Sequence, residues 1–363
     1  MGGDRVSLGG SRPAQPGPDG SPQKEPDGGG SPVADSDSKT AAGLPDQRGA
    51  AVLDGISRYG VVIVLLLMIV AFSIALPHTF PTTGNVKTIV NSAAVAMLLA
   101  LAATLPLRAG DFDLSIAGTM IVSAALVAQL TPGKVGWVLA LVIVLAVGAT
   151  VGVINAFLIV VIGLNGFVAT LGSLTVLEGL GLAITGGQVL TVASLHVRNF
   201  TTHNFLGLQA MTWYVWVIGL TMWYLFERTP SGRYLLFIGG NPRAALLAGL
   251  SVRRIRSSAF IWCGILSALA GFLYAGSIGA VDATVAGQYL LQPYAAAFLG
   301  ATTIAVGRFN ALGTIVGLYL LTVGIAGLQL FGASNWVTNV FNGLALIAAI
   351  TFARLATIRR GTG

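Results

Sequence analysis

The sequence predicts an all-α integral membrane protein with about ten transmembrane helices and with both termini in the cytoplasm. The composition supports this fold class, because 55% of the 363 residues are hydrophobic and only 9% are charged. Soluble domains carry about a quarter charged residues, so a soluble fold is excluded. The 48 glycines suit helices that pack closely in a membrane through small side chains.

The first 50 residues differ in composition from the rest of the chain. They are rich in Gly, Pro, Ser and Asp and hold almost no large apolar side chains. Such a segment cannot bury enough surface to fold. We therefore expect residues 1–50 to form a disordered cytoplasmic tail. It is not expected to be a signal peptide, because no apolar core follows Met1 directly.

Apolar stretches long enough to cross a membrane occupy most of the remaining sequence, since about 20 apolar residues span the hydrocarbon. We expect helices over about 58–76, 86–107, 114–130, 136–162, 166–186, 212–227, 257–277, 290–306, 310–331 and 336–354. Two Gly-rich stretches, 107–113 and 163–190, allow broken or re-entrant helices, which occur where protein or water covers the backbone.

Basic residues are distributed unequally between the two sides of these spans. With the N-terminus inside, the cytoplasmic segments hold most of the arginines, including six within 228–256, whereas the external segments hold only Lys87, Lys134 and Arg198. This asymmetry predicts the orientation of the chain. It also accounts for the net charge of +7 without a nucleic-acid partner.

The longest cytoplasmic segment, 228–256, contains a short helix with recognisable ends. Asn241 is a good N-cap, Pro242 suits the first helical position, and Gly249 can adopt the left-handed conformation that ends a helix. Small and apolar side chains lie between these ends. We interpret this helix as a surface for docking against another protein.

Several short motifs occur in a fixed order over about 58–355. They are Gly110-Asp-Phe-Asp-Leu-Ser-Ile-Ala-Gly118, Val168-Ala-Thr-Leu-Gly172, Thr185-Gly-Gly-Gln188, Gly232-Arg233, Gly239-Gly-Asn241, Gly249-Leu250, Gly300-Ala-Thr-Thr-Ile-Ala-Val-Gly307 and Gly313-Thr-Ile-Val-Gly317. In this combination the chain resembles the permease subunits of bacterial ABC importers of the ribose and related monosaccharide type. It departs from that family at Asp111, where a second Gly is usual, at 164–167 and at Glu178.

The resemblance implies a multi-pass protein of the bacterial inner membrane with the ABC importer permease fold over 51–363. It implies two copies of the permease, separate ATPase subunits that use ATP, and an extracytoplasmic sugar-binding protein. Within the cytoplasmic coupling loop, 228–256, the residues expected to contact the ATPase are Gly239, Gly240, Asn241, Arg243, Ala244, Ala245 and Gly249.

The chain lacks the motif of an ATPase. It has no Gly-x4-Gly-Lys-Ser/Thr loop, so we expect it not to be an enzyme and to bind no cofactor itself. No His, Cys or carboxylate cluster predicts a metal site. The histidines His78, His196 and His203 fall in predicted external loops and are expected to be solvated.

Polar residues within the spans are candidates for the translocation path, because charge in the bilayer costs about 3 kcal/mol or more. Glu178 is the acid deepest within a span; it either lines the path or pairs with polar neighbours. Asp111 and Asp113 either cap the following helix or form a gate. Asn155 and Asn339 can both donate to and accept from sugar hydroxyls, or join helices. The path candidates are Asp113, Asn155, Glu178 and Asn339.

Three classes of function are compatible with a polytopic chain. An ABC importer permease fits the docking helix and the missing nucleotide motif. An ion-coupled secondary transporter would require several buried acids, and an intramembrane enzyme would require convergent catalytic groups that the sequence lacks. Within the first class, a branched-chain amino-acid permease is the alternative to a sugar permease, and the Asp-Leu-Ser and Gly-Gly-Asn motifs favour sugar.

Overall fold

The computed structural model describes residues 47–132 and 135–361, which belong to one compact unit that begins at Gln47. The fold of these residues is helical, with four strands of two residues each. The helices are α1 (Gln47–Ala75), α2 (Thr83–Arg108), α3 (Ile116–Leu130), α4 (Trp137–Ala156), the π-helix η1 (Phe157–Val161), α5 (Gly166–Thr185), α6 (Leu195–Thr202), α7 (Ala210–Arg228), α8 (Pro230–Gly240), α9 (Pro242–Leu247), α10 (Val252–Ile278), the 3-10 helix η2 (Ala283–Val285), α11 (Gln288–Ala301), α12 (Ala311–Leu330) and α13 (Asn335–Gly361). The strands are β1 (Leu190–Thr191), β2 (Asn204–Phe205), β3 (Leu208–Gln209) and β4 (Ala280–Val281).

Each of the ten apolar stretches coincides with a helix: α1 to α5, α7 and α10 to α13. By length and composition, five of the helical segments among the described residues can cross a membrane: α2, α4 continued by η1, α5, α10 and α12. Shorter apolar segments occur in α1, α3 and α13. The helical architecture is therefore that of a multi-pass membrane protein.

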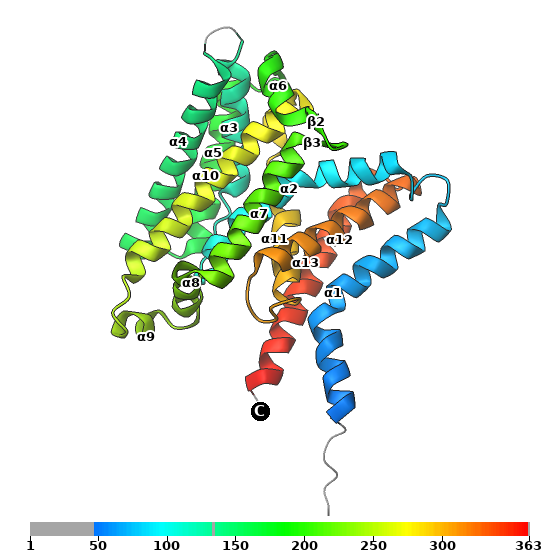
Figure 1. Cartoon of the computed structure of the whole chain (residues 1–363). Coiled ribbons are helices and arrows are strands. Elements are labelled where there is room, and N and C mark those ends of the chain that lie inside the picture. The colour runs from blue at the N-terminus through cyan, green and yellow to red at the C-terminus, as the bar shows by residue number, and fades with distance from the viewer. Residues whose placement is uncertain (1–46, 133–134, 362–363) are drawn as a thin grey trace, which may run out of the picture. The chain divides into compact units, whose positions relative to one another are not determined.

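The core of the fold is built around α2 and α10. In both helices 72% of the apolar segment is buried inside the chain, and α10 packs against α2, α3 and α4 (Figure 1). The helices α4 and α10 cross where Gly148 faces Gly264. A Cβ atom on either glycine would clash with the backbone of the other helix, so the small residues permit this close approach.

The structure tests the two Gly-rich stretches and the expected end of one further helix. The chain is irregular over 109–115, between α2 and α3, as the first stretch predicted. The second stretch, 163–190, allowed a broken or re-entrant helix; the chain is irregular at 163–165 and after Thr185, and α5 is unbroken from Gly166 to Thr185, close to the expected 166–186. The helix α11 ends at Ala301, short of the expected 306, because the chain turns with Ile304 at a positive φ of 61° and Gly307 at 83°.

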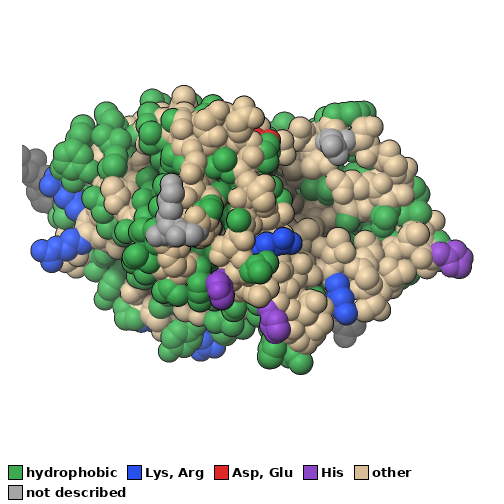
Figure 2. Space-filling model, turned by 90° about the horizontal axis from the view of Figure 1, so that it is seen from above, with side chains coloured by type: hydrophobic (Ala, Val, Ile, Leu, Met, Phe, Trp, Pro, Cys, Tyr) green, Lys and Arg blue, Asp and Glu red, His purple; other side chains and the backbone are tan. Residues whose placement is uncertain are grey.

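The two ends of the helical bundle carry different structures. At one end lie α8 and α9, which we call the α9 end (Figure 1). At the other lie α6, the antiparallel pair β1–β4 and the hairpin β2–β3, which we call the α6 end. Figure 2 looks at the α6 end and shows histidine side chains at the surface, and all three histidines are exposed as predicted.

The predicted tail lies almost wholly outside the described residues. Only its last four positions, 47–50, are described, and they belong to α1.

Candidate functional site

The segment 228–256 forms two helices in place of the single helix and loop that we predicted. Pro230 starts α8 directly after α7, and α8 runs to Gly240. Asn241 separates α8 from α9, and α10 begins at Val252. The segment is thus ordered along most of its length and presents α9 at the α9 end of the protein (Figure 1).

The caps predicted for α9 are present. The amide of Ala244 donates a hydrogen bond to Oδ1 of Asn241 over 3.0 Å, which satisfies a free donor of the first turn. At the other end, Gly249 has a φ of 80°, and the amide of Leu250 donates to the carbonyl of Ala245 over 3.1 Å. Two local caps therefore fix this six-residue helix, which is too short to be stable alone.

The outward face of α9 differs from the expected one. Ala245 is fully buried, so it packs against its own chain and cannot be a contact for a partner. The exposed side chains are Leu247, at 89%, and Leu246, at 65%. Ala244 is half-buried, and Arg243 and Gly240 are exposed. The sequence analysis missed the two leucines because α9 is too short for a periodic pattern to identify its buried side.

The α8–α9 element is held against the end of α2 by close backbone packing and by Arg108. A Cβ atom at Gly239 would clash with the carbonyl of Arg108. The Arg108 guanidinium is buried and donates to the carbonyl oxygens of Phe226 (3.0 Å), Gly232 (3.2 Å) and Phe309 (2.9 Å). From sequence, Arg108 was only a topology-setting charge; in the structure it joins the ends of α2 and α7, the start of α8 and the 302–310 loop.

The segment 109–115 lies beside this junction and carries the Asp-Leu-Ser motif. Its two aspartates have different partners. Asp111 forms a two-bond ion pair with Arg256 of α10, with Nε to Oδ2 at 2.8 Å and Nη2 to Oδ1 at 2.7 Å. Both carboxylate oxygens of Asp111 therefore bond to an arginine 145 positions away along the chain, and of the two alternatives for Asp111 the structure does not show a cap on the next helix.

Asp113 and Asn155, two of the path candidates, belong to one buried polar network. Oδ1 of Asp113 accepts from the amide and the hydroxyl of Ser115, at 3.1 and 2.6 Å. Nδ2 of Asn155 donates to Ser115 Oγ at 2.8 Å, and Oδ1 of Asn155 accepts from Ser173 at 2.7 Å. Both side chains are at most 1% exposed. This network joins the segment 109–115 to α4 and α5.

Two further contacts fix the same segment. The amide of Asp113 donates to the hydroxyl of Tyr294 on α11 over 3.2 Å, and the amide of Leu114 donates to Thr170 on α5 over 3.0 Å. The free backbone donors that a broken helix would leave are thus satisfied by side chains of neighbouring helices.

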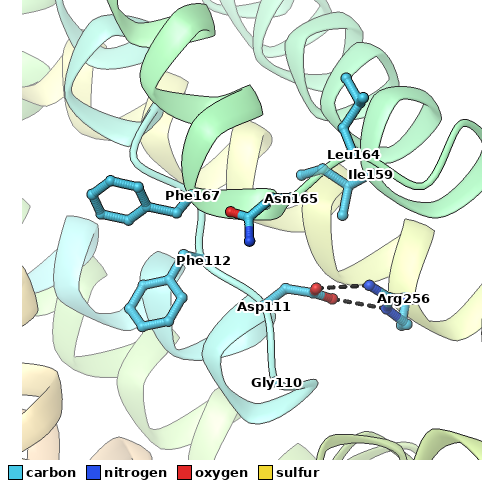
Figure 3. A pocket seen from close by; sticks show the side chains of 9 residues that line it. Gly110, Asp111, Phe112, Ile159, Leu164, Asn165, Phe167 and Arg256 are labelled. Atoms are coloured by element: carbon cyan, nitrogen blue, oxygen red, sulfur yellow. Dashed lines mark hydrogen bonds and ion pairs between the residues drawn. The ribbon is translucent and has the colours of Figure 1, made fainter.

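A pocket of about 430 Å³ adjoins the segment 109–115. Figure 3 shows Asp111 turned toward Arg256 and Phe112 turned to the other side, beside Phe167 at the start of α5. The lining residues are Gly110, Asp111, Phe112, Ile159, Leu164, Asn165, Gly166, Phe167 and Arg256. The pocket therefore lies between the segment and Arg256 near the start of α10 on one side and the junction of η1 and α5 on the other.

The remaining path candidates, Glu178 and Asn339, lie outside this network. Glu178 is half-buried on α5 and makes no hydrogen bond or ion pair with any described residue. Asn339 is exposed on α13. The structure brings together only Asp113 and Asn155 of the four candidates. Among the described residues, no group of three or more His, Cys, Asp or Glu side chains could hold a metal ion.

Five helical segments long and apolar enough to cross a membrane, with shorter apolar segments in three further helices, place the described residues in the class of multi-pass membrane proteins. The chain belongs to the family described as branched-chain amino acid transport system / permease component, whose model matches residues 85–350. The resemblance to ABC importer permeases is confirmed, and the protein is a multi-pass protein of the inner membrane.

Curated relatives of the chain are import permeases. It is 31% identical over 304 residues to the ribose import permease protein of Bacillus subtilis (strain 168), which covers 83% of this chain and 94% of the relative. It is 30% identical over 299 residues to the fructose import permease protein of Rhizobium meliloti, covering 79% and 82%. It is 26% identical over 292 residues to the ribose import permease protein of Escherichia coli (strain K12), covering 79% and 91%. No solved structure matches the chain.

Proposed function

We propose that this chain is the membrane-spanning permease subunit of an ATP-binding-cassette importer and that it moves a monosaccharide into the cell. The relatives named for ribose and fructose import support a sugar as the substrate. The sequence has no nucleotide-binding motif, which supports ATP hydrolysis by a separate subunit. A sugar-binding protein that docks at the α6 end would deliver the substrate.

The observation that carries this proposal is the exposed face of α9. Its two leucines project at the end of the protein where the arginines of 228–256 gather. Exposed leucines on a rigid, capped helix outside the lipid suit a groove on a partner protein. A partner that changes shape when it hydrolyses ATP could move α9, and with it the helices that α9 joins.

The test compares Leu247→Glu with Ala245→Glu. Leu247→Glu should insert normally but lose co-purification of the ATPase and lose sugar uptake, because it places a charge in the contact. Ala245→Glu should instead lower the amount of inserted protein, since it buries a charge within the chain. Arg243→Ala should be milder than Leu247→Glu. Full ATPase association and uptake in Leu247→Glu would show that α9 is only a connector.

The ten helices α1 to α5, α7 and α10 to α13 are proposed to cross the membrane, with both termini in the cytoplasm. The excess of arginine at the α9 end supports this orientation. Reporter fusions after Arg228 and after Thr202 should then report opposite sides of the membrane.

Two copies of the permease are proposed to pair through α5 and α13, with Glu178 and Asn339 facing the path between them. As in α4, only 22% of the apolar segment of α5 is buried within the chain, but α5 alone of the two carries a carboxylate, the half-buried Glu178, which has no partner among the described residues. Such a carboxylate in contact with lipid would be costly, so a second copy or a water-filled path should cover it.

Cysteine cross-linking tests this pairing. The single cysteine of the sequence, the buried Cys263, is first replaced by alanine. In that background Thr175→Cys, on the exposed face of α5, should form a disulfide-linked dimer. Val142→Cys is the matched control, because it is 55% exposed on α4, outside the proposed pair. Equal cross-linking at both positions would contradict a specific α5 interface.

A branched-chain amino acid is the second candidate substrate, because the description of the matching family names that class. Uptake of labelled ribose in the presence of excess leucine or excess fructose separates the two. Competition by fructose alone supports the sugar, and competition by leucine alone supports the amino acid.

A further inference from the structure

The ion pair between Asp111 and Arg256 joins two regions that the chain keeps far apart in sequence. Arg256 is the fifth residue of α10, nine positions after the last residue of α9, and Asp111 lies in the segment 109–115. The two hydrogen bonds, at 2.7 and 2.8 Å, fix the orientation of the guanidinium relative to the carboxylate in addition to the attraction between the charges. The Arg256 side chain is 24% exposed and the Asp111 side chain 10%, so water screens the pair only in part.

The same segment also contacts the other flank of α9. A Cβ atom on Gly110 would lie 3.4 Å from the Cα of Gly239, near the end of α8. The helix α9 is therefore flanked by two points of attachment to the segment 109–115. One is the close backbone contact at Gly239, and the other is the ion pair at Arg256.

On another side, the segment borders a pocket, and there Phe112 also lies close to Gly166 and Phe167. The pocket of about 430 Å³ lies between the ion pair and the residues 164–167 (Figure 3). Because 109–115 is not helical, it can shift without breaking a run of helical hydrogen bonds. If α9 moves, the close backbone contact at Gly239 would push the segment 109–115, and the pocket would give the segment volume to move into.

The far end of the segment reaches the buried network. Asp113 lies two residues after Asp111 and holds Ser115, while Asn155 connects Ser115 to Ser173 on α5. A shift of Asp111 would therefore be transmitted to α4 and α5 through hydrogen bonds that are already formed.

We propose that the Asp111–Arg256 ion pair is a mechanical strut that makes the segment 109–115 follow α9 when the ATPase moves it. Arg256 and Asp111 are positioning residues for transport, and they need not touch the sugar. This inference rests on the proposed function of α9. It predicts that loss of the pair separates ATP hydrolysis from sugar movement while leaving the assembly intact.

The test uses the full permease reconstituted with its ATPase and binding protein in liposomes, with labelled ribose as the probe. Asp111→Asn and Arg256→Gln should each lower the ribose taken up per ATP hydrolysed by about tenfold, which is within the range of coupling between sites. Each variant keeps a hydrogen-bonding amide in place of the charged group, so the amount of inserted permease should fall much less than the ribose taken up per ATP, and co-purification with the ATPase should stay unchanged.

Exchange of the two charges gives the decisive control. The double variant Asp111→Arg/Arg256→Asp should restore most of the uptake per ATP, which a merely structural role for either residue would not predict. Arg256→Lys, which keeps the charge but not the two-bond geometry, should fall between the wild type and Arg256→Gln. Arg254→Gln is the matched control, since Arg254 is exposed on the same turn and pairs with no described carboxylate; its uptake per ATP should be unchanged.

Unchanged uptake per ATP in both single variants would overturn the strut. Equal losses of inserted protein and uptake, or a double variant no better than the singles, would also overturn it. Failure of the proposed function is distinguishable from these outcomes. In that case the wild-type assembly itself would show no ATP-dependent uptake, or Leu247→Glu would retain the ATPase.

Discussion

The helix α9 and the segment 109–115 lie at the same end of the protein, but different interactions hold them in place. Caps within its own few residues fix α9, which exposes Leu246 and Leu247. Side chains from α4, α5, α10 and α11 fix the segment 109–115, and its aspartates are largely buried. The helix α9 therefore presents an exposed apolar face, whereas the segment 109–115 is an interior element whose aspartates have hydrogen-bond partners.

This difference teaches how the two elements can contribute to one function. A capped, exposed helix can bind a partner without changing the rest of the chain. A segment that is hydrogen-bonded to four helices can pass a displacement to them but cannot itself accept a new partner. Substitutions in the two regions should therefore have different effects. Those in α9 should weaken partner binding, whereas those in the segment and its surroundings should impair folding or the coupling of ATP hydrolysis to transport.

The largest effect is expected at the junction between the two regions. Arg108→Ala leaves the carbonyls of Phe226, Gly232 and Phe309 without their donor, within a buried site. It also leaves the Glu227 carboxylate, 3.6 Å from the guanidinium, without its cation, and breaking a buried ion pair costs about 3–5 kcal/mol. We expect little inserted protein and a low melting temperature in detergent. Arg254→Ala, at an exposed position, is the control, and a normal yield of Arg108→Ala would contradict the assigned role.

A smaller effect is expected within the buried network, where Asn155 and Asn339 make a matched pair. Asn155→Leu removes two hydrogen-bonding groups from a buried site and should cost about 1–3 kcal/mol of stability. Asn339→Leu changes an exposed side chain and should leave the melting temperature nearly unchanged, while lowering uptake if Asn339 faces the path. Thermal unfolding of both variants in detergent measures the difference, and equal shifts would show that the buried and exposed amides are equivalent.

The caps of α9 should have an effect of about 1 kcal/mol. Asn241→Ala removes the acceptor of the Ala244 amide, and loss of such an N-cap costs about that much. The chain should insert normally, and its affinity for the ATPase should fall about fivefold, because about 1 kcal/mol corresponds to that factor. Asn241→Ser can still cap the helix and should keep the affinity. A weakened Asn241→Ser would mean that the amide contacts the partner directly.

The smallest effect is expected from the N-terminal tail. Deletion of residues 2–45 removes almost no large apolar side chains and few charges near the first span. Insertion and transport should be nearly unchanged, as measured by the amount of membrane protein and by uptake in cells. Loss of inserted protein on deletion would assign the tail a role in topology or assembly.

The parts of the fold that depend on local sequence could be predicted. The ten apolar stretches coincide with helices, and the signals at Asn241 and Gly249 gave the limits of α9, because caps act over three or four residues. The break near 107–113 could be predicted as well. These features need no knowledge of distant contacts.

The parts that depend on distant contacts could not be predicted. The partner of Asp111 is 145 positions away along the chain, and Asn155 is 42 positions from Asp113. Whether Ala245 or Leu247 faces outward depends on what packs beneath α9, which one turn of helix does not reveal. Arg108 resembled an ordinary basic residue at a helix end, since its three carbonyl partners come from distant segments.

The central claim is that this permease imports a sugar only when an ATPase drives it. The most direct measurement is uptake of labelled ribose by liposomes that contain the purified chain, with and without the ATPase and the binding protein. We predict concentrative uptake only when both partners and ATP are present, and none under a proton or sodium gradient alone. Concentrative uptake by the chain alone under such a gradient would contradict the account and identify an ion-coupled transporter.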